Sequence, residues 1–362
     1  MTWRTWAAAE NDAIAASGRW RSVRTLDRGG VEATVDGREV VSFASNDYLG
    51  LTQHPAVIAA AHEALDRYGT GSGSARLIVG GRPPHTELEE ALAAWKSQQR
   101  ALLFPTGFAA NLGVLSVLGG PGVTICSDEL NHASIIDGCR LSKARVEVYR
   151  HRDLDHLDTL LGRVDRGVVV SDTVFSMDGD VADVEALSSV CASHGALLVL
   201  DEAHEVLGSL DVDGEVLRIG TLSKALASLG GFVAGPAPLV DLLVNRARSF
   251  IFTTASTPAD TAAALAALHI VRSAEGDARR ARLRAHVDRL RPDHPSPILP
   301  IVLGDEQQAL DASTALLELG LLVPAIRPPT VSSGSSRLRV TLSAAHTDEQ
   351  LDLLVSALDA LV

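Results

Sequence analysis

The sequence predicts an α/β protein with a large mixed-sheet α/β domain followed by a smaller α+β domain at the C-terminus. The first observation is the length of 362 residues, which exceeds one ordinary domain. The second is the alternation of amphipathic helical segments with short apolar strand segments up to about residue 240. The third is the scarcity of strand patterns after that point. We therefore expect a helix with small strands over 1–45, a large domain over 46–240 and a C-terminal domain over 241–362.

The elements follow from hydrophobic periodicity and from turn residues between the periodic segments. In the first two thirds, we expect helices over 7–17, 54–68, 84–96, 106–118, from about 132, 154–161 and 183–194. We expect strands within 31–44 around Asp36-Gly37, then over 101–104, 123–126, 145–149, 168–172, 196–201, 216–221 and 230–235. The last third predicts helices within 257–290, over 306–319 and from 347, with strands over 297–303 and 337–342. Residues 69–81 read as a glycine-rich loop.

Composition excludes several classes of protein. The net charge of −13 argues against nucleic acid as the main partner, because duplex binders normally carry a basic face. No run of about 18 apolar residues predicts a transmembrane helix, and the N-terminus lacks the apolar core of a signal peptide. Cys126, Cys139 and Cys191 lie far apart without zinc-ligand spacing, which is typical of a reducing compartment. We expect a cytoplasmic protein with no metal.

Polar residues follow several of the apolar strand segments. Asp128, Asp172, Asp201 and Lys224 all stand at or just beyond such a segment. Because the carboxyl ends of parallel strands meet at one edge of a sheet, we expect these side chains to converge on one crevice.

The chain contains only three lysines, so a reaction that needs a lysine amine has three candidates. Lys96 and Lys143 stand at helix ends, where a solvated cation is the simplest interpretation. Lys224 instead follows a strand and precedes two glycines, so burial in the crevice would lower its pKa and favour Schiff-base chemistry. The alternative is an ordinary surface lysine.

Asp201 and two histidines extend this hypothesis. A carboxylate after a buried strand needs a cation, and the protonated pyridine nitrogen of pyridoxal phosphate (PLP) is one. A helix cap or a salt bridge is the alternative for Asp201. His204 could reach a ring hydroxyl and His132 could stack on the ring, although a lone histidine is more often a satisfied polar residue.

Phosphate groups are bound by helix N-termini and hydroxyl side chains. Three segments fit this pattern: Thr106-Gly107-Phe108, Thr221 with Ser223, and Thr253-Thr254. The loop over 69–81 matches neither a dinucleotide fingerprint nor a Walker A motif, and no helix follows its near-match to a hydrolase elbow. We therefore reject those three interpretations.

The order of motifs resembles the α-oxoamine synthases, which are PLP enzymes of aminotransferase fold type I. The resemblance runs from about residue 40 to the C-terminus. Its motifs are Asn46-Asp47-Tyr48-Leu49-Gly50-Leu51, Gly71-Ser72-Gly73, His85 with Glu87-Leu88-Glu89, Thr106-Gly107-Phe108-Ala109-Ala110-Asn111, Asn131-His132-Ala133-Ser134, Val174 to Asp180, Asp201-Glu202-Ala203-His204 and Thr221-Leu222-Ser223-Lys224-Ala225.

The resemblance implies a role for each matching cofactor residue. Lys224 would bind PLP covalently and exchange a proton at the substrate α-carbon. Asp201 would pair with the ring nitrogen, and His132 would stack on the ring. The remaining PLP-binding residues would be Gly107, Phe108, Ser176, His204, Thr221 and, from the second subunit of a homodimer, Thr254.

The same resemblance implies the substrates. Residues 326–330 and 337–342 resemble the branch of the family that condenses L-alanine with pimeloyl-CoA, or a pimeloyl carrier protein, in biotin synthesis. Arg339 would bind the amino-acid carboxylate, while Arg327 and Thr330 would line the acyl site. Arg19 or Arg21 would meet the carboxylate of the acyl donor.

Departures from the family pattern leave alternatives open. The segment between His204 and Lys224 is shorter than is usual in the family, Ser74 and Ala75 replace more common residues, and Ser332 stands where proline is common. The alternatives are another α-oxoamine synthase, such as one using glycine and acetyl-CoA, an aminotransferase, or a PLP-binding protein without turnover.

Overall fold

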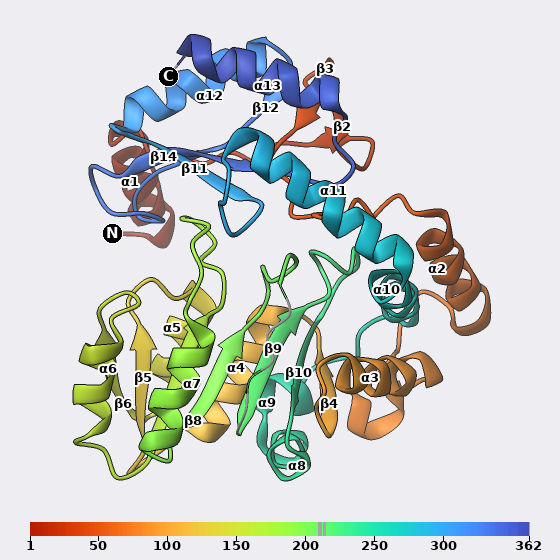
Figure 1. The fold of residues 1–362 in the computed structure, drawn as a ribbon, viewed down its shortest axis with the longest axis vertical. Coiled ribbons are helices and arrows are strands. Elements are labelled where there is room, and N and C mark those ends of the chain that lie inside the picture. The colour runs from red at the N-terminus through yellow and green to blue at the C-terminus, as the bar shows by residue number, and fades with distance from the viewer. Residues whose placement is uncertain (209–211, 213–214, 362) are drawn as a thin grey trace.

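The computed structural model describes residues 1–208, 212 and 215–361. Figure 1 shows two halves facing each other, with a large sheet flanked by helices below and smaller sheets with their helices above. The N-terminus and the C-terminus both lie in the upper half.

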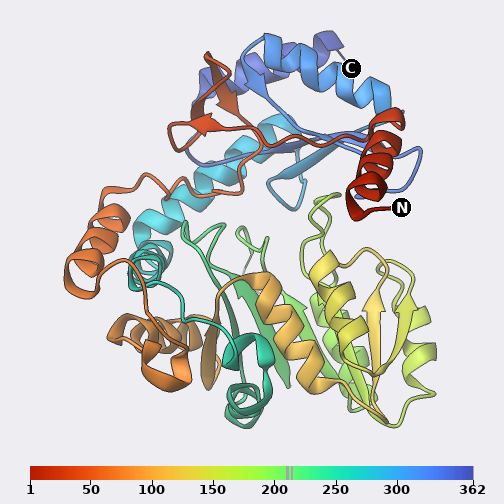
Figure 2. The same ribbon diagram turned by 180° about the vertical axis from the view of Figure 1, so that it is seen from behind.

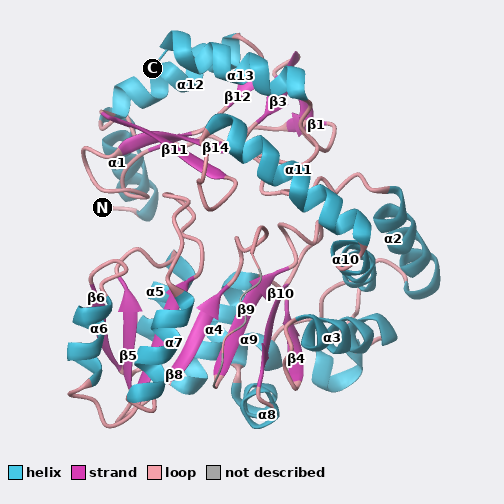
Figure 3. Ribbon diagram, viewed as in Figure 1, coloured by secondary structure: helices cyan, strands magenta, loops and turns pink. Residues whose placement is uncertain are grey.

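The lower half is built on a seven-stranded mixed sheet with the order β4-β10-β9-β8-β7-β5-β6 (Figure 3). Its strands are β4 (Arg100–Phe104), β5 (Thr124–Asp128), β6 (Arg145–Tyr149), β7 (Gly167–Asp172), β8 (Leu197–Asp201), β9 (Val216–Thr221) and β10 (Gly231–Gly235). The strands from β9 to β6 run parallel, and β10 runs antiparallel to both β4 and β9.

Helices cover both faces of this sheet because its strands are apolar on both sides. Val168 and Val170 pack toward one face, and Val169 between them packs toward the other. The first face is covered by α4 (Gly107–Leu118), α5 (Ala133–Leu141), α8 (Ala237–Arg246) and α9 (Arg248–Ile251), which are seen in front of the strands in Figure 2. The second face is covered by α6 (Leu154–Leu161) and α7 (Val184–Ser193).

The upper half combines segments from the two ends of the chain. One sheet has the order β11-β14-β13, and the other has the order β1-β2-β3-β12. These strands are β1 (Leu26–Asp27), β2 (Glu32–Val35), β3 (Arg38–Ser42), β11 (Ile298–Gly304), β12 (Leu321–Leu322), β13 (Ala325–Ile326) and β14 (Ser336–Thr341). The helices of this half are α1 (Trp3–Ala16), α11 (Ala274–Leu290), α12 (Glu306–Glu318) and α13 (Asp348–Leu361). Because β3 pairs with β12, the N-terminal strands share a sheet with C-terminal residues.

Three further helices lie beside the β4 edge of the large sheet: α2 (Pro55–Tyr68), α3 (Pro83–Trp95) and α10 (Pro258–Val271) (Figure 1). A short π-helical segment, Arg76–Gly80, precedes α3. Among the described residues, no helix is long and apolar enough to span a membrane.

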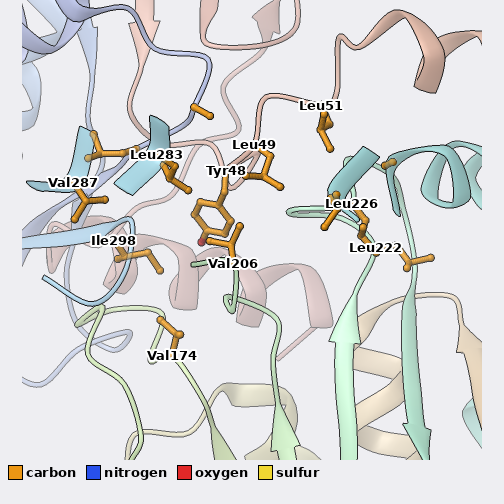
Figure 4. Close-up of a cluster of buried hydrophobic side chains, with 14 of the residues drawn as sticks. Tyr48, Leu49, Leu51, Val174, Val206, Leu222, Leu226, Leu283, Val287 and Ile298 are labelled. Atoms are coloured by element: carbon orange, nitrogen blue, oxygen red, sulfur yellow. The ribbon is translucent and has the colours of Figure 1, made fainter. Parts of the chain in front are cut away.

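One apolar cluster joins the two halves. Figure 4 shows Tyr48 at its centre, between Leu283 and Ile298 on one side and Leu222 and Leu226 on the other. These side chains are almost fully buried. The cluster fixes how the upper half sits above the strand ends of the large sheet.

The predicted fold class is confirmed, and most predicted elements agree with the structure within one to four residues at their ends. The two-residue strands β1, β12 and β13 and the four-residue helix α9 were not predicted, because such short elements carry little periodicity of their own. The ten-residue helix α8 was not predicted either, and Pro236 and Pro238 at its start are residues that also mark turns. The domain limits near 45 and 240 stay a prediction. The predicted shortening between His204 and Lys224 falls partly on residues 209–211, 213 and 214, which lie outside the described residues.

Candidate active site

Polar side chains converge at the carboxyl ends of β7, β8 and β9, as the sequence predicts. Asp172 and Asp201 end two neighbouring parallel strands and are paired in register. Thr221 ends β9, the next strand, and Lys224 follows three residues later. The regular register of parallel strands therefore places four reactive groups at one sheet edge.

The amine of Lys224 has a pKa well below the usual lysine value. Its Nζ atom lies 2.9 Å from Nε2 of His204. Burial lowers the pKa of Lys224 to about 8, even though the carboxylates of Asp201 and Asp172 oppose the shift. A buried amine of this kind is largely unprotonated just above pH 8, which is the form that attacks carbonyl groups.

Asp201 is a buried carboxylate held in a fixed orientation. Its Oδ2 atom accepts a hydrogen bond of 2.7 Å from the Asn111 side chain, and its Oδ1 atom accepts one of 2.9 Å from the Ala203 backbone. Asn111 comes from α4, and its Oδ1 atom is buried without a hydrogen-bond partner among the described residues. The pair therefore presents a fixed negative charge next to the amine of Lys224.

His132 caps the start of α5 beside the same carboxylates. Its backbone N–H donates to Oδ2 of Asp172 at 2.7 Å, and its ring Nδ1 lies 2.7 Å from the Ser134 hydroxyl. Burial lowers the pKa of His132, so the ring is neutral near pH 7. Burial and the neighbouring charge of Asp201 raise the pKa of Asp172 well above its usual value.

A chain of hydrogen bonds links the amine of Lys224 to β14. Nδ1 of His204 lies 2.5 Å from the Tyr48 hydroxyl, which lies 3.2 Å from Oδ1 of Asn46. Nη2 of Arg339 donates to that Oδ1 atom at 3.3 Å. Burial lowers the pKa of His204 well below its usual value, so its ring is neutral. Arg339, from the upper half, is thereby aligned with Lys224 from the lower half.

The start of α4 provides donors for an anion. Thr106 caps the helix, and its hydroxyl accepts a hydrogen bond of 3.0 Å from the Ala109 backbone. The N–H groups of Gly107 and Phe108 belong to the first turn of the helix, where N–H groups have no acceptor within the helix. The Thr221 hydroxyl lies 2.7 Å from that of Ser223, and a Cβ atom at Gly107 would stand 3.4 Å from Cβ of Thr221. Backbone N–H groups at a helix start, together with hydroxyl side chains, are the groups that bind a phosphate in proteins.

The predicted acyl-site residues line a cavity that is separate from the cluster around Lys224. It has a volume of about 890 Å³ and lies between α1 and the 325–330 segment. Arg19, Arg21, Arg327 and Thr330 all line it. Nη1 of Arg327 donates to the Gly18 carbonyl at 2.8 Å, and Arg19 pairs with Glu306.

Two predicted PLP-binding residues, Ser176 and Thr254, are not joined to the cluster around Lys224 by their side chains in the described part of the chain. The Ser176 carbonyl accepts a hydrogen bond of 2.6 Å from Nε of Arg339, whereas in the described part of the chain the Ser176 hydroxyl makes no hydrogen bond to the cluster around Lys224. Thr254 is exposed and lines a small pocket with Arg76 and Pro105. Within the described chain, the structure therefore does not bring Thr254 to Lys224.

Three residues of this site, Asn111, Tyr48 and Asn46, have no individual role in the sequence-based prediction. Asn111 is the one amide in the otherwise apolar segment Gly107–Leu118, which is a signal that could have identified it. Tyr48 and Asn46 stand in a motif that was noticed only for its resemblance to a family. Their contacts with His204 and Arg339 depend on the tertiary fold.

No group of His, Cys, Asp and Glu side chains that could hold a metal ion is found within residues 1–208, 212 and 215–361.

Comparison with known proteins agrees with this geometry. Residues 38–358 match the family described as aminotransferase class I and II. The 8-amino-7-oxononanoate synthase of Anaeromyxobacter dehalogenans is 48% identical over 381 residues, covering 99% of this chain and 95% of that protein. The synthase of the same name from Alkalilimnicola ehrlichii is 48% identical over 370 residues, covering 95% of this chain and 94% of its own.

Solved structures show the same fold. Serine palmitoyltransferase of Sphingomonas wittichii aligns with a TM-score of 0.91 at 32% identity, covering 98% of this chain and 96% of that one. A serine palmitoyltransferase structure containing PLP aligns with a TM-score of 0.90 at 29% identity over the same shares. The 8-amino-7-oxononanoate synthase of Francisella tularensis aligns with a TM-score of 0.74 at 26% identity, covering 89% of this chain and 96% of that one.

Proposed function

Because this chain belongs to the aminotransferase class I and II family, we propose that it condenses L-alanine with a pimeloyl thioester. The products are 8-amino-7-oxononanoate, carbon dioxide and free thiol. The chain is a PLP-dependent acyltransferase of biotin biosynthesis. Our proposal concerns which amino acid and which acyl donor it uses. The observation that supports this choice is the 48% identity of the chain, over 95–99% of its length, to relatives named 8-amino-7-oxononanoate synthase.

The residues present fit PLP. Asp201 offers a buried, oriented carboxylate for the ring nitrogen, and Lys224 offers an amine for covalent attachment. Gly107 and Phe108, at the start of α4, offer backbone N–H groups for the phosphate, and Thr221 offers a hydroxyl. We assign the ring hydroxyl to His204, with Ser176 nearby, and one face of the ring to His132. When bound, PLP delocalises negative charge from the α-carbon of an amino acid.

Lys224 carries out the proton transfers. With a pKa of about 8, its amine can take a proton from the α-carbon and later return one to the product. Asp201 keeps its partner nitrogen protonated, since a buried carboxylate strongly favours an adjacent cation. His132, at the start of α5, is placed to donate to the oxygen of the thioester as negative charge develops there.

The groups that would bind the substrates all come from the upper half of the molecule. Arg339 binds the amino-acid carboxylate, since a guanidinium matches a carboxylate with two parallel hydrogen bonds. Arg327 and Thr330 line the acyl site, and Arg19 or Arg21 meets the distal carboxylate of the pimeloyl group. We further propose a cytoplasmic homodimer, in which Thr254 of one copy reaches the phosphate site of the other.

Release of thiol tests the substrate choice. Purified enzyme loaded with PLP is given L-alanine, glycine or L-serine, each with pimeloyl-CoA, acetyl-CoA or palmitoyl-CoA. We expect the highest kcat/KM for L-alanine with pimeloyl-CoA. Substitution Arg339→Lys should raise the KM for L-alanine at least tenfold, because it removes one arm of the carboxylate contact.

A second acyl transfer on the same scaffold is supported by the structural likeness to serine palmitoyltransferase. The same panel separates the two functions. A preference for L-serine with palmitoyl-CoA, or for glycine with acetyl-CoA, would overturn the biotin-pathway substrates while keeping the site residues.

A further inference from the structure

A short loop between the two halves holds Arg339 in place. We call residues 175–180 the bridging loop. Its ends are closed by a bridge between Val174 and Val181 and by a hydrogen bond from Phe175 N to the Asp180 carbonyl. The loop is therefore a compact unit that can be positioned as a whole.

The upper half binds the bridging loop at three points. Nε of Arg339 donates to the Ser176 carbonyl at 2.6 Å, and Arg337 pairs with Asp178. The Ser296 hydroxyl donates to the Gly179 carbonyl at 2.6 Å. Because Nε fixes the rotation of the guanidinium plane, the position of the Ser176 carbonyl sets the direction in which Arg339 presents its other nitrogens.

The lower half holds the bridging loop through His151, which follows β6. Nδ1 of His151 lies 2.9 Å from Oδ1 of Asp128, and Nε2 lies 2.8 Å from Oδ2 of Asp180. Both partners are carboxylates, which accept hydrogen bonds, so both ring nitrogens must carry a proton. The ring also meets the edge of Phe175, with centroids 4.4 Å apart.

The charges around His151 favour this imidazolium. Asp128 faces it from β5 and Asp180 from the bridging loop, while Arg152 pairs with the same Asp180 oxygen at 3.3 Å. Glu129 accepts a hydrogen bond from the His151 backbone at 2.8 Å. Burial alone would lower the pKa of His151, but the hydrogen bonds and charges of Asp128 and Asp180 outweigh it and raise the pKa to about 9.

We propose that His151 is a positioning residue for the amino-acid carboxylate: as a cationic bridge between Asp128 and Asp180, it fixes the bridging loop, whose Ser176 carbonyl aligns Arg339. The inference rests on the proposed role of Arg339. His151 follows β6, the edge strand of the large sheet. The proposal therefore makes a residue of the lower half a determinant of the affinity for the amino acid. Small displacements of such a binding group are costly, because binding depends on bidentate geometry.

The test compares His151→Gln with a matched control. His194→Gln removes another histidine–aspartate pair, with Nε2 of His194 2.8 Å from Oδ1 of Asp158, away from the bridging loop. The dissociation constant of L-alanine is measured from the absorbance change of bound PLP, and the affinity for PLP is measured separately. We expect His151→Gln to weaken L-alanine binding about tenfold with PLP affinity unchanged, and His194→Gln to stay within about twofold of wild type.

A pH profile adds a readout that a purely structural role would not move. In wild type and in the His194 variant, L-alanine affinity should show an additional loss as pH rises through about 9, where His151 loses its proton. His151→Gln should lack that component. Other groups that titrate in this range are common to all three proteins, so the difference between the profiles isolates His151.

Two outcomes would overturn the proposal: unchanged L-alanine affinity in His151→Gln, or an equal loss of affinity for L-alanine and PLP. If that variant does not fold, Asp180→Asn keeps the pair between His151 and Asp128, and unchanged L-alanine affinity there would also overturn it. Failure of wild type to bind L-alanine contradicts the proposed substrate instead. The comparison is then made with whichever amino acid wild type binds, since the carboxylate is common to all of them.

Discussion

The Tyr48 hydroxyl connects the cofactor side of the site to the substrate side. It lies between His204 and Asn46, and those residues contact Lys224 and Arg339 respectively. Tyr48 is fully buried, and burial raises its pKa to about 12, so the hydroxyl stays protonated at any physiological pH. Because that one proton is donated to Oδ1 of Asn46, the hydroxyl oxygen accepts from the Nδ1–H of His204 and fixes the tautomer of its neutral ring.

Tyr48→Phe should destabilise the protein. The substitution leaves a ring nitrogen of His204 and Oδ1 of Asn46 with one partner fewer in a buried site, at a cost of about 1–3 kcal/mol. Chemical denaturation measures the change in the free energy of unfolding. Tyr68→Phe, at a partly exposed ring, is the matched control and should change it by less than about 0.5 kcal/mol. Equal stability of both variants would contradict the hydrogen bond to His204.

The rate of covalent PLP uptake should rise with pH through about 8. Lys224 attacks only as the neutral amine, and its pKa is lowered to about 8 by burial. Uptake is measured at several pH values by trapping the attached cofactor with borohydride. Lys224→Ala should trap none. A midpoint near the ordinary lysine value of about 10.4 would contradict a buried amine.

Residues of the site differ in how far the sequence could predict them. Asp201 and Lys224 follow apolar strand segments, so the rule for strand ends identified them. Asn111 and Tyr48 act through partners 90 and 156 residues away in the chain. Such contacts arise only when α4 packs on the sheet and the upper half closes over it. The local sequence could single out Asn111 as the one amide of Gly107–Leu118, but not its partner Asp201.

At the scale of elements, the bridging loop depends on one glycine. Gly179 has a φ of +69°, and a Cβ atom there would stand 2.0 Å from the Ile298 carbonyl oxygen. Gly179→Ala therefore combines backbone strain with a steric clash against β11. We expect it to lower the melting temperature and to raise the KM for L-alanine, because the clash moves the Ser176 carbonyl away from Arg339.

Gly37→Ala is the matched control for this prediction. Gly37 has a φ of +79° in the β2–β3 turn, with no atom within 4 Å of the added Cβ. Its cost is the strain alone, about 1–2 kcal/mol, with no effect on KM. Equal losses of stability in the two variants would show that the contact between Gly179 and β11 is not tight.

The elements themselves were largely predictable because most are long and periodic. The strands β6 and β9 and the helix α6 have the predicted bounds. The two-residue strands β12 and β13 are stabilised by pairing with β3 and β14, which a local sequence window does not contain. The helix α9 has only four residues, and the helix α8 has Pro236 and Pro238 at its start, which also mark turns, so neither was predicted.

At the scale of the whole molecule, neutral buried histidines should make the protein sensitive to acid. His346 accepts a hydrogen bond from the Ser343 backbone and donates one to the Ser42 carbonyl, both at 3.0 Å. Burial lowers its pKa to about 4, whereas the unfolded value is about 6.5. Between these values the unfolded chain binds more protons, so stability is complete above pH 6.5 and falls as pH decreases toward 4.

The expected loss from His346 alone is about 3 kcal/mol between pH 6.5 and pH 4. It is measured as the difference in unfolding free energy between wild type and His346→Gln at each pH. That difference should shrink as pH falls, because the variant has no proton to gain at this position. A constant difference across the range would contradict a neutral buried ring. His151 acts in the opposite direction, since its raised pKa contributes stability that is lost as pH rises through about 9.

We propose that one site carries out a decarboxylative condensation. In it Lys224 transfers protons at the α-carbon and Arg339 binds the carboxylate of the amino acid. The most direct measurement uses L-alanine labelled with ¹³C in its carboxyl group, together with pimeloyl-CoA. We expect equal amounts of labelled carbon dioxide and free thiol from wild type, and neither product from Lys224→Ala. Thiol release without labelled carbon dioxide, or either product from the Lys224 variant at the wild-type rate, would contradict it.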